Sequence, residues 1–213
     1  MQAVRAERGM AGAPEGEGPV RTPHGTLSWS QTAELSAPGA AIGLLGGVIA
    51  GGLLAISGLS LSLTLIAAVL LAVPLALTGA AYEILLAKGR VPMGTLSGAA
   101  MVWAVAWAPI RVVHAAAIDV VAGNPVAMPQ GFWSFVAYQV LVSVPFAIGF
   151  WWLHENFAPR WWFHIRNRNP VANHFIRVQL QYAEAAEEEK ELRRARREQR
   201  LAQRRGRASR RDG

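Results

Sequence analysis

From Pro38 to Leu86 the chain reads PGAAIGLLGGVIAGGLLAISGLSLSLTLIAAVLLAVPLALTGAAYEILL, with Glu83 as its only charged side chain. A helix needs about 20 apolar residues to cross the hydrocarbon core of a bilayer, so this block is long enough for about two crossings. A single helix of that length would extend far beyond the bilayer. The block therefore predicts a helical hairpin, with spans at about 39–58 and 61–85 joined by a tight turn.

Two further apolar blocks follow the hairpin. They predict spans at about 96–121 and 132–153. The sequence GNP at 123–125, followed by Pro129, marks the loop between these spans, because glycine and proline interrupt helices. The sequence thus predicts an all-α, polytopic membrane protein with four transmembrane helices.

Charged residues make up only 16% of the 213 residues, and they crowd the two ends of the chain. A uniformly basic, soluble nucleic-acid-binding protein would not show this partition. The partition predicts four parts. They are a disordered cytoplasmic tail (1–36), a four-helix membrane domain (37–156), an interfacial aromatic and basic segment (157–178), and a charged cytoplasmic helix and tail (179–213).

Lysine and arginine predict the orientation, because loops rich in them stay in the cytoplasm. Lys88 and Arg90 lie between the second and third spans, and several arginines follow the fourth span, whereas the other two loops carry neither residue type. Both termini are therefore expected in the cytoplasm. The excess of arginine over lysine, with abundant alanine and glycine, favours a GC-rich bacterial source and hence the cytoplasmic (inner) membrane.

Tryptophans gather where the fourth span should leave the bilayer, at Trp151, Trp152, Trp161 and Trp162. Such residues favour the headgroup level, because the ring is apolar while its N–H needs a partner. We expect these four to be interfacial anchors, with the neighbouring arginines reaching anionic lipid.

Small residues recur every fourth position in the first span, at Gly39, Gly43, Gly47, Gly51 and Ala55. This spacing places them on one helix face and resembles a glycine zipper. Small side chains let a second helix approach closely in lipid. The face is expected either to pack against the second or fourth span, or to form an interface with a partner or a second copy.

Arg111 is the ionisable residue that lies furthest inside a predicted span. It lies about 22 Å along the third span at the helical rise, in the outer half of the bilayer. His114 shares its face, Gln139 reaches a similar depth on the fourth span, and Asp119 is the nearest acidic residue. We expect these four residues to form an intramembrane polar cluster.

A charge inside the membrane is costly and is by default a hypothesis of function. Three interpretations of Arg111 remain open. The side chain snorkels to the outer headgroups with Asp119 nearby, meets an acidic residue of another subunit, or belongs to a transport or catalytic site.

The segment HAAAID, from His114 to Asp119, resembles the catalytic pair of glycerolipid acyltransferases, although no companion substrate motif follows. His154, Glu155, His164 and His174 are not expected to converge as a zinc site requires, because His154 and Glu155 are adjacent and diverge on a helix, and cysteine is absent. Only His114 lies inside a predicted span, which does not support an internal bis-histidine haem. We therefore expect no catalytic residue, no metal and no cofactor.

From Gln179 to about Arg205 the sequence predicts an exposed helix with acidic residues first and arginines last, an order that favours the helix dipole. This helix either is solvated and secures the topology, or docks on anionic lipid, an acidic protein or nucleic acid. No aromatic residue interleaves the arginines, so specific nucleic-acid recognition is not expected.

These features favour a non-catalytic accessory, assembly or scaffold subunit of a larger inner-membrane complex, in contact with lipid and with other membrane subunits or itself. The alternative is a small oligomeric transporter or channel, in which several copies enclose a path and Arg111 favours anions. A third hypothesis is a membrane-bound lipid-modifying enzyme that uses His114 and Asp119.

Overall fold

The computed structural model describes residues 27–56, 58–128 and 131–209, with side chains described as far as residue 199. Within these ranges the chain forms five helices and no strand. The first four are long and apolar enough to span a membrane, which confirms this part of the prediction and makes the chain a multi-pass α-helical membrane protein. The helices are α1 (Trp29–Ile56), α2 (Leu61–Ala87), α3 (Leu96–Val121), α4 (Phe132–Ile165) and α5 (Pro170–Ser209).

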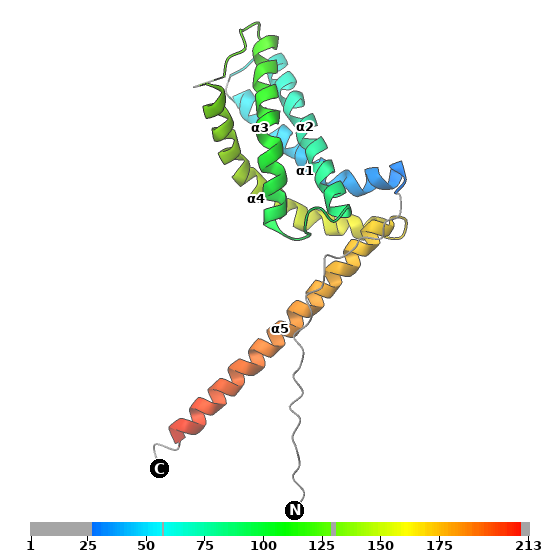
Figure 1. The fold of residues 1–213 in the computed structure, drawn as a ribbon, viewed down its shortest axis with the longest axis vertical. Helices are drawn as coiled ribbons and strands as arrows, with labels where there is room; N and C mark the ends of the chain where they lie inside the picture. Colours follow the sequence, from blue (N-terminus) through cyan, green and yellow to red (C-terminus); the bar gives the residue numbers. More distant parts are fainter. Residues whose placement is uncertain (1–26, 57, 129–130, 210–213) are drawn as a thin grey trace, which may run out of the picture.

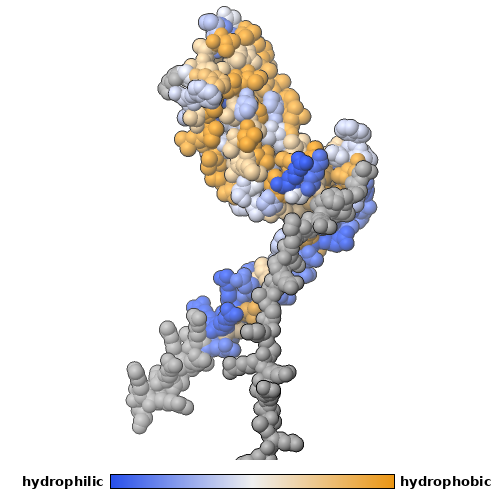
Figure 2. All heavy atoms as spheres, in the orientation of Figure 1, coloured by the Kyte–Doolittle hydropathy of each residue, from blue (hydrophilic) through white to orange (hydrophobic). Residues whose placement is uncertain are grey.

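The four apolar helices pack in two pairs. α1 packs chiefly against α2, and α3 against α4, while contacts of α2 with α3 and of α1 with α4 join the pairs. The α2–α3 loop, the last part of α4 and the start of α5 gather at one end, here called the base (Figure 1). The outward surface of the bundle is apolar, whereas the described surface of α5 is mostly hydrophilic (Figure 2). An apolar exterior is what lipid requires of a spanning domain.

Glycines define where α2 and α3 stop. Gly89 and Gly123 adopt φ values of +64° and +72°, a region that side chains with a Cβ avoid. The amide after each glycine donates back to a carbonyl in the last helical turn, at 2.9 and 2.8 Å respectively. These bonds satisfy carbonyls that the helix itself leaves free and direct the chain into the next loop.

The glycine-rich face of α1 packs against α2. A Cβ added at Gly39, Gly43 or Gly47 would overlap atoms of α2, so the two backbones approach as closely as only glycine permits. Ala55, by contrast, is exposed beyond this contact. The glycine-rich face of α1 is therefore occupied by α2 of the same chain. The facing residues are Gly39 with Gly79, Gly43 with Leu75, Gly47 with Ala72 and Gly51 with Ala68.

The predicted interfacial segment 157–178 is instead divided between two helices. α4 has 34 residues, and its last third turns across the base (Figure 1). α5 then begins at Pro170, earlier than predicted. Asn169 caps it by accepting a hydrogen bond from the Ala172 amide at 3.2 Å, and proline suits the first helical position. The first turns of α5 bury apolar side chains, namely Val171, Ala172, Phe175, Ile176 and Val178.

α1 begins at Trp29, within the region predicted as a disordered tail over 1–36, of which residues 1–26 lie outside the described chain. The start of α1 is tied to the α4–α5 corner. Asn169 donates to the Gln31 carbonyl at 2.8 Å, and Arg168 forms an ion pair with Glu34 at 2.9 Å. Composition alone did not reveal this helix, because its partners lie more than a hundred residues away.

Candidate functional site

Arg111 and His114 lie on α3 at its seam with α2. Arg111 Nη1 is 2.9 Å from His114 Nδ1, and His114 Nε2 is 3.0 Å from the Ala67 carbonyl oxygen. A guanidinium can only donate, so Nδ1 accepts and Nε2 carries the hydrogen that it donates to Ala67. The histidine in this arrangement is neutral, and it leaves the charge of Arg111 uncompensated. We call these two residues the α3 site.

The other two members of the predicted polar cluster make different contacts. Gln139 accepts a hydrogen bond from the Trp107 indole at 3.1 Å, inside the α3–α4 contact. Asp119 Oδ2 accepts from the Ala127 amide at 3.0 Å and so fixes the α3–α4 loop. The structure thus brings Arg111 and His114 together but does not join Gln139 or Asp119 to them. Among the described residues, no carboxylate forms an ion pair with Arg111.

The contacts of His114 and Asp119 do not suit an acid–base pair. Both ring nitrogens of His114 are engaged by Arg111 and Ala67, and the Asp119 carboxylate is engaged by the loop. Among the hydrogen bonds and ion pairs of the described residues, none joins these two side chains. The resemblance of the HAAAID segment to an acyltransferase motif therefore gains no support from the geometry.

A second ionisable cluster lies inside the bundle toward its base, and sequence patterns did not single it out. Glu83 of α2 and His154 of α4 are both 0% exposed, and His154 Nε2 is 3.0 Å from Glu83 Oε1. We call them the buried pair. On the other side of the imidazole, Nδ1 is 3.4 Å from Glu155 Oε1, and the Glu155 side chain is 27% exposed. The imidazole therefore stands between an inner and an outer carboxylate.

Aromatic rings surround the imidazole of the buried pair. The ring centroids of Tyr82, Trp162 and Phe150 lie 5.1, 5.6 and 5.9 Å from that of His154. Glu83 Oε2 and the Tyr82 hydroxyl are buried and have no hydrogen-bond partner in the described part of the chain. A buried polar atom left without a partner costs about 1–3 kcal/mol. Such an arrangement is costly to maintain, which makes it a candidate for function.

No protein-family model, curated protein or solved structure matches this chain. Across the described residues, no three histidine, aspartate or glutamate side chains converge as a metal site would require. The α3 site and the buried pair are therefore the candidate functional sites of the described chain.

The depth of the residues was the signal that could have revealed the buried pair. α2 and α4 run in the same direction, and Glu83 and His154 each lie about 33 Å from the first residue of their helix at the helical rise. Residues at equal depth on packed helices can meet. Glu83 is the one charge in its apolar block, and His154 is the ionisable residue at the same depth on α4.

The four predicted tryptophan anchors occupy different environments. Trp152 is 58% exposed and Trp161 is 37% exposed, and the Trp161 N–H donates to the Glu34 carbonyl at 2.7 Å. Trp151 is partly buried. Trp162 differs from the expectation, since it is 1% exposed. The first turns of α5 explain this, because Phe175 packs on Trp162 with ring centroids 4.7 Å apart.

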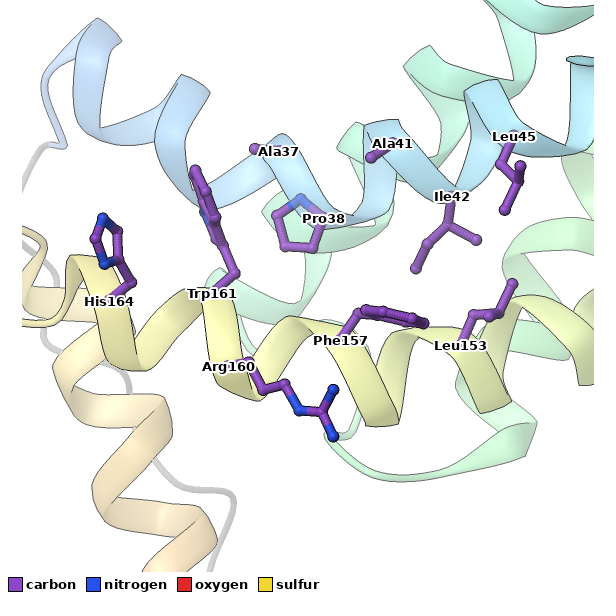
Figure 3. Close-up of a pocket in the computed structure, with 10 residues that line it drawn as sticks. All are labelled: Ala37, Pro38, Ala41, Ile42, Leu45, Leu153, Phe157, Arg160, Trp161 and His164. Carbon is purple, nitrogen blue, oxygen red and sulfur yellow. The ribbon is translucent and has the colours of Figure 1, made fainter.

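A groove of about 510 Å³ lies between the first half of α1 and the last third of α4 (Figure 3). Pro38 and Phe157 face each other across it, and Trp161 stands between the two helices. Its ionisable lining residues are Arg160 and His164, and the Arg160 side chain points away from α1 (Figure 3). The groove therefore offers an apolar shape without converging polar groups, which does not suit a catalytic pocket.

Proposed function

We propose that this protein is a non-catalytic accessory, assembly or scaffold subunit of a larger membrane complex, held to a partner subunit through Arg111. The observation that carries the proposal is the half-buried guanidinium of Arg111, which has no carboxylate partner in the described chain. A carboxylate on a second membrane subunit would supply the missing charge.

Energetics support a partner for this residue. A charged side chain at the centre of a spanning helix costs on the order of 2.5–3.5 kcal/mol, and a hydrogen bond to a neutral histidine does not neutralise it. Snorkelling to the headgroups is the other way to lower this cost. Here the guanidinium is bound to His114, which is itself bound to α2 through Ala67, so the side chain is held at the seam.

The long helix α5 also suits a scaffold. Beyond residue 180 its described residues are exposed, and its charges pair along the helix, as in the 2.7 Å bond between Arg193 and Glu189. The α2–α3 loop, which carries Lys88 and Arg90, lies at the base, where α5 begins (Figure 1). On the basis of this basic loop, we propose that both termini lie in the cytoplasm and that the membrane is the bacterial inner membrane.

The test is affinity purification of the tagged full-length chain from native membranes in mild detergent, with the co-purifying proteins identified by mass spectrometry. The proposal predicts a stoichiometric set of membrane proteins with the wild type, at least about a tenfold loss with Arg111→Leu, and retention with Arg194→Leu. The second variant removes the same charge from the exposed part of α5.

Equal recovery of the same set with Arg111→Leu would contradict the role of Arg111. Recovery of the wild type alone, or only with copies of itself, would contradict the accessory-subunit proposal. That result would favour the small oligomeric transporter, which flux measurements in liposomes then test.

A further inference from the structure

The described residues contain a chain of proton-carrying groups from the surface at the base to the interior of the bundle. Its outer member is Glu155, whose carboxylate is 27% exposed. A Cβ on Gly94 would lie 3.9 Å from Glu155 Oε2, which places this carboxylate beside the α2–α3 loop. The middle member is His154 and the inner member is Glu83, linked at 3.4 and 3.0 Å.

We propose that Glu155 and His154 deliver a proton to Glu83, so that the buried pair is a reversible proton-binding site. The inference is independent of the proposed partner contact, because it uses α2 and α4 residues at the base and not Arg111. An imidazole suits this position, since its two nitrogens accept and release protons on opposite sides of one ring.

The transfer balances without another reactant. Glu155, protonated from the aqueous side, gives its proton to His154 Nδ1 while Nε2–H passes its proton to Glu83 Oε1. Glu155 becomes a carboxylate, Glu83 becomes a neutral carboxylic acid, and the imidazole stays neutral in its other tautomer. Release by the same route restores the first tautomer, so no ring rotation is needed.

Glu83 Oε2 has no hydrogen-bond partner in the described chain, and this favours protonation of the Glu83 carboxyl. As an anion, Glu83 keeps Oε2 without a hydrogen bond at a fully buried position, which is costly in a weakly polar medium. Protonation removes that charge. The other titratable groups that act on the pair are Tyr82 on α2 and Glu155 on α4. From α1 the backbone of Gly39 lies against the Glu83 side chain and acts on its carboxyl, and it carries no net charge.

The test uses the full-length protein in lipid nanodiscs, with infrared difference spectra recorded between acidic and alkaline pH. The proposal predicts a band of a buried, protonated carboxylic acid that titrates in the wild type and is absent in Glu83→Gln. Glu188→Gln, which removes an exposed carboxylate from α5, should keep the band. Persistence of the band in Glu83→Gln, or its absence from the wild type, would overturn the site.

The kinetics of proton uptake test the relay without disturbing the core. After a rapid drop in pH, Glu155→Gln should reach the same final band amplitude at least about tenfold more slowly than the wild type. An unchanged rate would show that the proton reaches Glu83 by another route and would overturn the role of Glu155. Near-ultraviolet circular dichroism of each variant confirms that the aromatic packing is retained.

Discussion

The α3 site and the buried pair both place ionisable groups inside the bundle, but they are completed in different ways. Glu83 meets His154 within the chain, with both side chains fully buried and aromatic rings around them. Arg111 meets only a neutral histidine, and its guanidinium remains half-exposed at the α2–α3 seam. Glu83 has a hydrogen-bonding partner within the chain and can lose its charge by binding a proton, whereas the guanidinium of Arg111 stays charged and requires a group from outside the described chain.

This difference separates two kinds of intramembrane charge. A pair that is buried on all sides acts within its own chain, either in packing or in proton binding. A half-exposed cation without a carboxylate suits recognition between subunits, because an acidic residue on the partner offsets its cost. The stability of the isolated protein should therefore depend strongly on the buried pair and weakly on Arg111.

The largest expected effect is that of His154→Ala. Removing one member of a buried pair leaves the other uncompensated, which costs about 3–5 kcal/mol. We expect a corresponding loss in the free energy of unfolding, measured by denaturant titration in detergent micelles. Glu155→Gln is the matched control, because it removes the other carboxylate beside His154 and its side chain is partly exposed. An equal loss of unfolding free energy in the two variants would show that the buried pair contributes no more to stability than the partly exposed Glu155.

A smaller loss is expected when α1 is pushed away from the buried pair. A Cβ at Gly39 would overlap the Gly79 carbonyl and lie 3.0 Å from Glu83 Cγ. Gly39→Leu should therefore cost about 1–3 kcal/mol through overpacking. Gly52→Leu is the control on the same helix, since a Cβ there meets no atom within 4 Å. Thermal unfolding of both variants in the same detergent measures the difference, and a stable Gly39→Leu protein would show that close α1–α2 contact is not required.

The smallest effect on the isolated protein is expected for Arg111→Leu. Loss of the hydrogen bond to His114 and relief of an uncompensated charge act in opposite directions. The free energy of unfolding of the purified protein should change by less than about 1 kcal/mol. A loss as large as that of His154→Ala would mean that Arg111 has an essential structural role within its own chain.

The boundaries of the apolar helices followed from local chemistry. Gly89 and Gly123 end α2 and α3 where the sequence predicts loops, because both sites require a left-handed backbone that glycine adopts readily. The Arg111–His114 contact was also predictable, since residues three apart share a helix face.

Other features depended on contacts that local patterns do not encode. Gln139 was predicted to join Arg111 because the two residues lie at a similar depth. Instead, it accepts a hydrogen bond from the Trp107 N–H, because α3 and α4 pack together there. Trp162 was predicted to be an interfacial anchor, but Phe175 of α5 packs on its ring. The Asn169–Pro170 start of α5 and the apolar face that follows were readable signals, but the density of arginines around them favoured an interfacial interpretation.

Site-specific photo-cross-linking beside Arg111 shows whether this residue contacts a second membrane subunit. A photoreactive residue at Ala115, four residues further along α3 and on the same face, should trap another membrane protein when native membranes are irradiated. The same residue at Val105, which is 72% exposed on a different face, is the control and should not trap that protein. We expect an adduct at Ala115 that disappears when Arg111→Leu is added. An adduct that survives this change, or cross-linking at Ala115 to lipid alone, would contradict this expectation.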